Sequence, residues 1–258
     1  MTPERLVVER DGAIARVWLD RPRVLNALDT QTLEEIAAVL PGLGPHTGTR
    51  VVVLGGRGSS FCAGADRKDP PARLPRSSVA GAGARRHAAQ VGLRALEAIE
   101  RCEAITLARL HGHVIGGGVV LALGCDLRVA AATASFHIPE VDLGVPLTWG
   151  AAPRLAREVG LARAKELILL CDRFDAAAAE RWGLLNRVVA DDALDATVGE
   201  LARRLAAKPE WAVHMTKSQF QAYARTTVLG DVTAIDGDLL RAASAEDPTR
   251  FAFPKRDG

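Results

Sequence analysis

Short apolar runs and amphipathic stretches alternate along most of the chain. The apolar runs have the length and the β-branched content of strands. They cover residues 6–9, 13–20, 50–54, 104–110, 126–131 and 186–190. The first two runs flank Asp11-Gly12, a dipeptide that is typical of a tight hairpin. The run at 50–54 has the uniformly apolar character of a buried parallel strand.

Between these runs, apolar residues recur at intervals of three or four, which predicts helices. The first helix begins after Asp29, a residue type that caps helix N-termini. A second helix carries Val91, Ala95 and Ile99 on one face. Further helices are predicted at 151–159, 161–170, 176–182, and from 191 to about 245 with breaks at 208–209 and 230.

The alternation of strands and helices predicts an α/β protein with a mainly parallel sheet. We expect residues 1–195 to form this α/β core. Residues 196–258 are predicted to be a C-terminal helical region that is too small to bury a core of its own, so it should pack on the core or on another subunit. Residues 67–83, rich in Pro, Gly, Ser and Arg, predict a mobile loop of the kind that often flanks a binding site.

Composition and charge exclude several classes of protein. The 33 basic residues nearly balance the 31 acidic ones, which gives no electrostatic case for binding nucleic acid. Residues 1–12 lack the apolar segment of a signal peptide, and the longest apolar stretch, around 115–125, is too short to span a membrane. The widely spaced cysteines predict reduced thiols. We therefore expect a cytoplasmic protein without membrane contact.

Two features suggest a site for chemistry. Gly116-Gly117-Gly118 precedes an apolar helical run, and the first turn of a helix offers unpaired N–H groups that could hold an oxyanion. Glu140 is the only acid in the segment 136–141 and could move a proton beside it. Each feature alone is also typical of tight packing or of a solvated loop. A third segment, FCAGAD at 61–66, makes the combination informative.

Several stretches, in order along essentially the whole chain, resemble the crotonase superfamily, the enoyl-CoA hydratase/isomerase group. They are RPRVLNALD at 21–29, FCAGAD at 61–66, HGHVIGGGVVLALGCDLRVAAATASF at 111–136, PEVDLGVP at 139–146 and WGLLNRVV at 182–189. The resemblance implies a spiral of β-β-α units with a C-terminal helical region that forms trimers. It also implies an acyl-CoA thioester as substrate, no separate cofactor, and a homotrimer or dimer of trimers.

The resemblance also assigns roles to single residues. It implies that the backbone N–H groups of Ala65 and Gly117 hold the thioester oxygen, and that Glu140 is the acid/base. Family hydratases carry a second glutamate at a position occupied here by Val120, which cannot bind water or donate a proton. A 1,3 proton shift needs only one carboxylate, and burial would raise its pKa toward the working pH. Enoyl-CoA double-bond isomerisation is therefore the best chemical fit.

Two alternatives remain open at this point. The protein could be a hydratase in which Asp142 or an ordered water replaces the missing glutamate, since Asp142 points the same way as Glu140 in an extended segment. It could also bind acyl-CoA without catalysis, with Val120 marking lost chemistry.

Other residues are matched to the substrate by the resemblance. Asp66, Arg67 and Lys68 correspond to a segment that continues along the CoA, where the two basic side chains could attract phosphates. Trp149 is expected to narrow the acyl pocket. Residues 253–256, FPKR, resemble an aromatic and basic ending that can reach the CoA of a neighbouring subunit.

The histidines and the rival motifs predict no other chemistry. His111 and His113 look like half a metal site without a third ligand, so we expect a structural role and no bound metal. His137 is expected to pack rather than react. A dinucleotide-binding GxGxxG, a phosphate-binding GK[ST] loop and a serine hydrolase GxSxG are all absent from the sequence.

Overall fold

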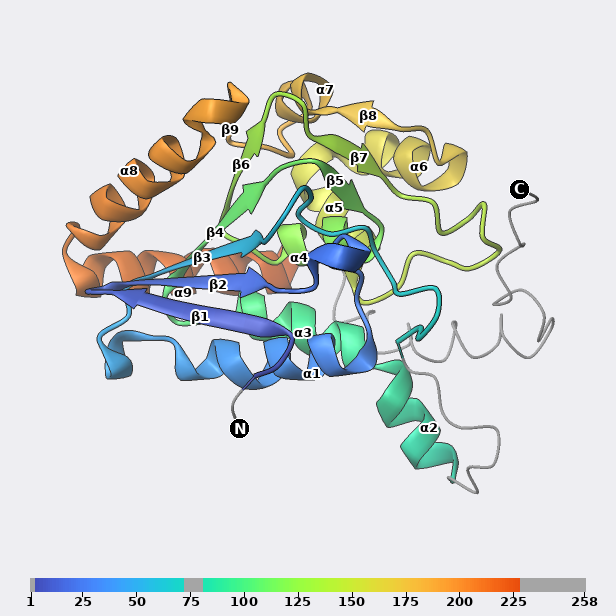
Figure 1. Cartoon of the computed structure of the whole chain (residues 1–258), viewed down its shortest axis with the longest axis horizontal. Coiled ribbons are helices and arrows are strands. Elements are labelled where there is room, and N and C mark those ends of the chain that lie inside the picture. The colour runs from blue at the N-terminus through green and yellow to red at the C-terminus, as the bar shows by residue number, and fades with distance from the viewer. Residues whose placement is uncertain (1–2, 72–80, 228–258) are drawn as a thin grey trace.

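The computed structural model describes residues 3–71 and 81–227 and is built on a six-stranded sheet of order β1-β2-β3-β4-β6-β9 (Figure 1). The strands are β1 (Leu6–Asp11), β2 (Ile14–Leu19), β3 (Val51–Gly56), β4 (Ile105–Leu110), β6 (Leu127–Ala131) and β9 (Arg187–Val189). The hairpin predicted at Asp11-Gly12 joins the antiparallel pair β1 and β2, and all later neighbours are parallel. Every strand predicted from an apolar run is present.

A second, smaller sheet has the order β5-β7-β8 and was not predicted. Its strands are β5 (His113–Ile115), β7 (Ser135–His137) and β8 (Phe174–Asp175). A turn at Gly112, which has a φ of 56°, separates β4 from β5, and a short turn likewise separates β6 from β7. Two successive units therefore contribute one strand to each sheet, and a helix follows the first unit directly.

Helices cover both faces of the larger sheet. The helices of the described residues are α1 (Thr30–Val39), α2 (Ala82–Ala89), α3 (Val91–Glu100), α4 (Gly117–Leu123), α5 (Ala151–Val159), α6 (Leu161–Leu170), α7 (Ala176–Arg181), α8 (Leu194–Ala206) and α9 (Glu210–Thr227). Asp29 caps α1 as predicted, since its carboxylate accepts a hydrogen bond from the backbone N–H of Thr32 at 2.7 Å. The predicted bounds of α5 and α6 are confirmed, and so is the α/β class.

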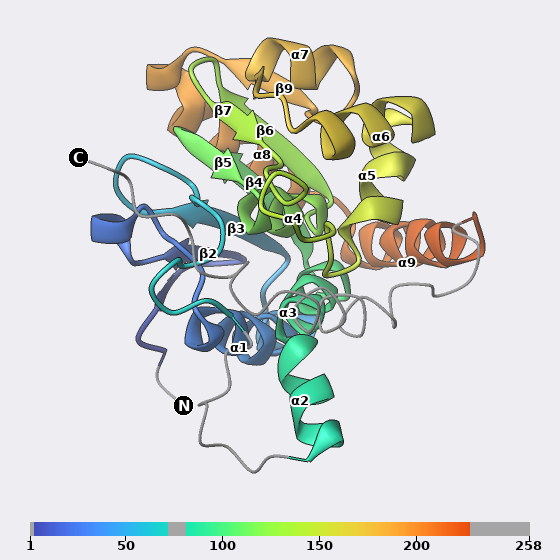
Figure 2. The ribbon, with the colours of Figure 1, turned by 90° about the vertical axis from the view of Figure 1, so that its right-hand side faces the viewer.

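The alternation of side chains along the central strands divides the core into two parts. In β3, Val52 and Leu54 face the main core, whereas Val51 and Val53 face α8. The residues of α8 that cover this second face are Leu194, Val198 and Ala202. Turning the molecule by 90° shows α4 enclosed next to α3 and α5, which makes α4 the central helix of the fold (Figure 2).

Some sequence predictions fall partly outside the described residues. Of the loop predicted at 67–83, residues 67–71 form neither helix nor strand, residues 72–80 lie outside the described part, and α2 begins at Ala82. The predicted helical region is confirmed as far as Thr227, and the ending at 253–256 lies outside the described residues. Within residues 3–71 and 81–227, none of the helices is long and apolar enough to cross a membrane.

Candidate active site

The triple glycine begins α4, and at each of the three glycines a side chain from elsewhere in the chain lies where a Cβ atom would be. Gly116 has a φ of 50° and a ψ of −114°, and a Cβ atom on it would lie 2.6 Å from Glu140 Oε1. A Cβ atom on Gly117 would lie 2.7 Å from Cζ3 of Trp149 and 2.9 Å from Cδ1 of Leu28. The absence of side chains therefore brings a carboxylate and an aromatic ring onto the first turn of α4.

The FCAGAD segment lies directly beside this turn. Its start pairs with β5: the N–H of Cys62 donates to His113 O at 3.0 Å, and the N–H of Ile115 donates to Cys62 O at 3.0 Å. Gly64 has a φ of 88°, and a Cβ atom on it would lie 2.9 Å from Ile115 O and 3.8 Å from the nitrogen of Gly117. The two segments that the sequence analysis assigned to an oxyanion site are thus in contact, as expected.

Ala65 presents its N–H on the side away from Leu28. The backbone of Leu28 bridges the residues on either side of it: Leu28 N donates to Gly64 O and Asp66 N donates to Leu28 O, both at 2.8 Å. This parallel bridge leaves the N–H of Ala65 on the opposite side. Within residues 3–71 and 81–227, no group accepts a hydrogen bond from the N–H of Ala65 or of Gly117. Both N–H groups are therefore donors without an acceptor among the described residues, in two segments that adjoin each other.

Glu140 holds a desolvated carboxylate beside these donors. A turn positions the residue, because its carbonyl oxygen accepts from Leu143 N at 3.1 Å and from Val145 N at 3.0 Å. Its Oε2 atom is buried and has no hydrogen-bond partner among the described residues. Burial raises the pKa of this carboxyl to about 7, against the opposing effect of a hydrogen bond from its own backbone N–H. A carboxyl in this state can both accept and return a proton near neutral pH.

Apolar side chains surround the same turn. Val120 lies on α4, one turn beyond Gly116, and is almost completely buried in the main core. Trp149 has a φ of 59°, and its half-buried ring lies against Gly117 and against Gly92 of α3, where a Cβ atom would lie 2.0 Å from the ring. The expected role of Trp149 in narrowing an acyl pocket stays a prediction.

The other polar residues near Glu140 lie in different surroundings. Asp142 is exposed on the turn after Glu140. His137 is half-buried, and its Nε2 makes a hydrogen bond of 2.9 Å with the carbonyl oxygen of Cys171. Burial, together with the nearby charge of Arg173, lowers the pKa of His137. These contacts give His137 a place in the packing between β7 and the end of α6.

His111 and His113, the pair that resembled half a metal site, lie in different surroundings. His111 Nε2 lies 2.9 Å from Gly58 O, and its Nδ1 lies 2.8 Å from Nη1 of Arg109. His111 therefore joins β4 to the loop before FCAGAD. His113 is exposed at the start of β5. Within residues 3–71 and 81–227, no three His, Cys, Asp or Glu residues are grouped to hold a metal ion.

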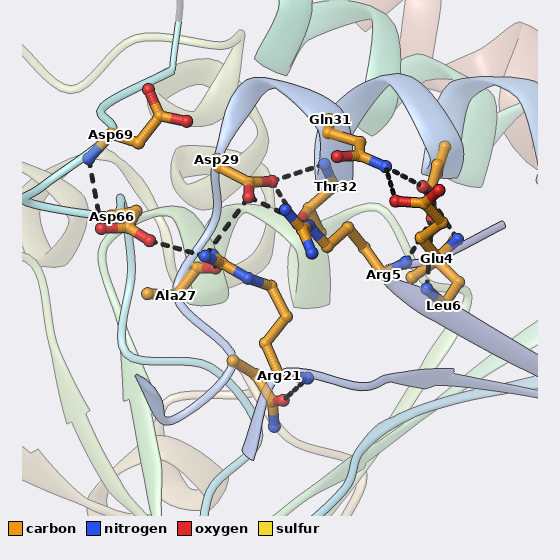
Figure 3. A network of polar contacts seen from close by, with 12 residues as sticks. Glu4, Arg5, Leu6, Arg21, Ala27, Asp29, Gln31, Thr32, Asp66 and Asp69 are labelled. Carbon is orange, nitrogen blue, oxygen red and sulfur yellow. Dashed lines mark hydrogen bonds and ion pairs between the residues drawn. The ribbon is translucent and has the colours of Figure 1, made fainter. Parts of the chain in front are cut away.

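The side chain of Asp66 has partners within the protein. Its Oδ2 accepts from Arg21 at 2.9 Å, and its Oδ1 accepts from the backbone N–H of Asp69 at 3.3 Å (Figure 3). Oδ1 also accepts from the backbone N–H of Lys68 at 2.9 Å. Burial alone would raise the pKa of Asp66, but these hydrogen bonds together lower it. Its expected contact with substrate stays a prediction. The Arg67 and Lys68 side chains that follow are exposed, as a phosphate contact would require.

Sequence reasoning missed two residues that shape the site. Asn26, in the NALD stretch, has a φ of 56° and is buried, and its Nδ2 donates to the carbonyl oxygens of Arg57 at 2.9 Å and Ser60 at 2.8 Å. It thereby holds the loop that leads into FCAGAD. Arg21 begins the longer stretch RPRVLNALD, and its guanidinium forms an ion pair with Asp66. The available signal was the polar character of both residues between two apolar runs.

The chain is similar to proteins of one family over nearly its whole length. The family model described as enoyl-CoA hydratase/isomerase matches residues 9–253. The chain is 33% identical over 218 residues to the short-chain-enoyl-CoA hydratase of Clostridium acetobutylicum, which covers 84% of this chain and 81% of the relative. It is 34% identical over 215 residues to the peroxisomal Delta(3,5)-Delta(2,4)-dienoyl-CoA isomerase of Arabidopsis thaliana, with 81% and 77% covered. A solved enoyl-CoA hydratase from Mycobacterium avium subsp. paratuberculosis matches with a TM-score of 0.85 at 26% identity, over 98% of each chain.

Proposed function

Because this chain belongs to the enoyl-CoA hydratase/isomerase family and has its crotonase-type fold, we propose that its site binds an acyl-CoA thioester with the carbonyl oxygen between the N–H groups of Ala65 and Gly117. Two backbone donors in adjoining segments, neither with an acceptor among the described residues, support this assignment. Each such donor stabilises the charge that develops on an oxyanion and contributes a factor of about 10²–10³ in rate in other enzymes. The site then favours formation of a thioester enolate.

Glu140 is the proton-transfer group in this proposal. The observation that carries it is the buried Oε2 atom, which has no hydrogen-bond partner in the described part of the chain. The Oε1 atom of the same carboxylate lies against Gly116 and hence beside the Gly117 donor. A pKa of about 7 suits a group that alternates between base and acid near neutral pH. The carboxylate takes the α-proton of the thioester, and the electron pair of that C–H bond passes into the enolate.

Isomerisation of a 3-enoyl-CoA to a 2-enoyl-CoA needs nothing further. Loss of the proton from C2 gives a dienolate whose oxygen the two donors hold. The protonated Glu140, which can exchange its proton with solvent, then delivers a proton to C4, and the double bond lies between C2 and C3. Hydration also requires a group that holds water and delivers its parts to two carbons. Val120, buried in the apolar core, can make no hydrogen bond to water. We therefore favour isomerisation.

Hydration is the second candidate, and the names of the relatives favour it. The relative from Clostridium acetobutylicum is called a short-chain-enoyl-CoA hydratase. In this case Glu140 would act on a water held by another group, and Asp142 is the residue to test. The exposed position of Asp142 supports hydration less well than the buried Oε2 atom of Glu140 supports isomerisation.

The functional unit is proposed to be a trimer or a dimer of trimers. The motivation is α9, which presents large apolar side chains to solvent, with Trp211 76% and Phe220 69% exposed. Exposed apolar residues grouped on one helix mark an interaction surface, and a second copy of this chain is the proposed occupant. Sedimentation at micromolar concentration should show a multiple of three subunits, and a stable monomer would refute the proposal.

The ratio of two kcat/KM values distinguishes the candidate reactions. The kcat/KM for isomerising a 3-enoyl-CoA should exceed the kcat/KM for hydrating a 2-enoyl-CoA of equal chain length. Val120→Glu, which adds a carboxylate on α4 to that of Glu140, should move this ratio toward hydration. Faster hydration by the native protein that also survives Glu140→Gln would overturn the single-base assignment. Tight acyl-CoA binding with neither reaction would indicate a binding protein.

A further inference from the structure

The guanidinium of Arg21 lies between two carboxylates at the edge of the proposed oxyanion site (Figure 3). Its Nη2 is 2.9 Å from Asp66 Oδ2 and 3.3 Å from Asp29 Oδ2, and its Nη1 donates to the carbonyl oxygen of Ala27. The Arg21 side chain is only 17% exposed. One planar group thus contacts three acceptors from two segments of the chain.

These acceptors flank the bridge that orients the Ala65 donor. Ala27 and Asp29 are the neighbours of Leu28, and Asp66 is the neighbour of Ala65, which pairs with Leu28 in the bridge. Arg21 therefore ties the two segments together on either side of that pair. A hydrogen bond weakens steeply as its N–H···O angle departs from linear. The stabilisation that the Ala65 N–H can give to an oxyanion therefore depends on how firmly this peptide is held.

We propose that Arg21 is a positioning residue: it aims the N–H of Ala65 at the thioester oxygen through Asp66 and Leu28. The inference rests on the proposed function and adds a residue to its machinery. Arginine suits this task because its rigid fork of donors can serve several acceptors in one plane, whereas the single ammonium of lysine cannot. Arg21→Lys should therefore keep the charge and lose the geometry.

Arg5 provides a matched control on the same network. Its Nε also contacts Asp29 Oδ2, at 3.2 Å, but its side chain contacts none of residues 61–66 within the described part of the chain. Arg5→Lys thus changes an ion pair of Asp29 and leaves the Ala65 loop untouched. If Arg21 serves only the stability of this network, the two substitutions should have similar effects.

The test compares kcat, substrate KM and the affinity for free CoA in these variants. Since free CoA lacks the thioester carbonyl, its binding does not use the Ala65 donor. Arg21→Lys should lower kcat about tenfold to a hundredfold, which is less than the loss expected when the donor is removed completely. KM and the affinity for free CoA should change less than about threefold. Arg5→Lys should leave all three values near native. Equal losses in both variants, or a native kcat in folded Arg21→Lys, would overturn the proposal.

Infrared spectroscopy provides a readout that a merely structural role would not move. A saturated acyl-CoA with a 13C-labelled carbonyl should show a lowered C=O stretching frequency when bound to the native protein, because the two donors polarise the bond. Arg21→Lys should return the frequency part of the way toward its value in water, and Arg5→Lys should not. An unchanged shift in Arg21→Lys would refute the positioning role.

A second variant covers the case in which Arg21→Lys does not fold. Asp66→Asn can still accept from the backbone of Lys68, but its amide group would face the guanidinium with a donor. It should reproduce the loss of kcat, and normal turnover in this folded variant would overturn the proposal. Failure of the proposed function is distinguishable, because the native protein itself would then turn over neither 3-enoyl- nor 2-enoyl-CoA.

Discussion

Replacing Glu140 by glutamine should make the stability of the protein less dependent on pH. The native protein keeps the Glu140 carboxyl buried, with Oε2 unpaired among residues 3–71 and 81–227, and burial raises its pKa from 4.5 to about 7. Between these two pH values the folded state binds more protons than the unfolded state, so stability falls as the pH rises through this window. The amide of Glu140→Gln does not titrate and removes this dependence.

The magnitude follows from the size of the shift. At about 1.4 kcal/mol per pKa unit, a carboxyl shifted from 4.5 to about 7 destabilises the folded state by roughly 3 kcal/mol near pH 8 and by roughly 1 kcal/mol near pH 5. The stability of Glu140→Gln relative to the native protein should therefore increase by about 2 kcal/mol between the two conditions. This change is a better measure than either difference alone, because a buried amide has its own desolvation cost.

Urea unfolding at the two pH values, at one protein concentration so that assembly contributes equally, measures this change. Asp142→Asn is the matched control, since it removes an acidic side chain from the exposed part of the same turn. Substitutions at exposed positions usually change stability by less than about 0.5 kcal/mol. A relative stability of Glu140→Gln that is the same at both pH values would show that the native carboxyl is solvated, and would refute the argument from burial.

Three further predictions concern catalysis. The kcat/KM for proton abstraction should rise with pH through about 7 and then level off, because Glu140 acts as a base in its ionised form, and a profile that is flat from about pH 5 to 9 would contradict this. Gly117→Pro should abolish turnover, since proline fits the first position of a helix but lacks the N–H, and circular dichroism should show that the variant is folded. Gly117→Ala also crowds Trp149 but keeps the N–H, so it should retain more activity. Gly92→Ala should shift the preferred acyl chain length without changing free CoA affinity, because its methyl group would meet the ring of Trp149, and a selectivity profile identical to the native one would show that this ring does not border the acyl chain.

The elements with strong local signals were predictable from the sequence. Asp29 marks the start of α1 because its side chain can cap the helix, and Gly160 separates α5 from α6 because a residue with a φ of 78° cannot continue a helix. The larger sheet was predictable for the same reason, since its strands are apolar runs of five or six residues in most cases. The strands of the smaller sheet have only two or three residues. Their pairing depends on distant backbone groups, which no local pattern records.

The residue types of the candidate site were predictable, but their surroundings were not. Nothing near Glu140 in the sequence indicates burial, because the space that its carboxylate occupies is provided by Gly116, which lies in another element. Gly92 accommodates the ring of Trp149 in the same way. Arg21 lies far from Asp66 along the chain, so only the fold shows that they form an ion pair. Contacts between distant segments thus decide which polar residues serve the site and which hold it in place.

The exchange of the α-proton of an acyl-CoA with solvent tests the central claim most directly, because it reports enolate formation whichever reaction follows. A short-chain 3-enoyl-CoA incubated with the protein in D2O should acquire deuterium at C2 or C4, as mass spectrometry and NMR can detect. Glu140→Gln should lower the exchange rate by a factor of about 10²–10⁴ while binding free CoA with native affinity. Exchange that persists at the native rate in Glu140→Gln would contradict the assignment of Glu140 as the proton-transfer group.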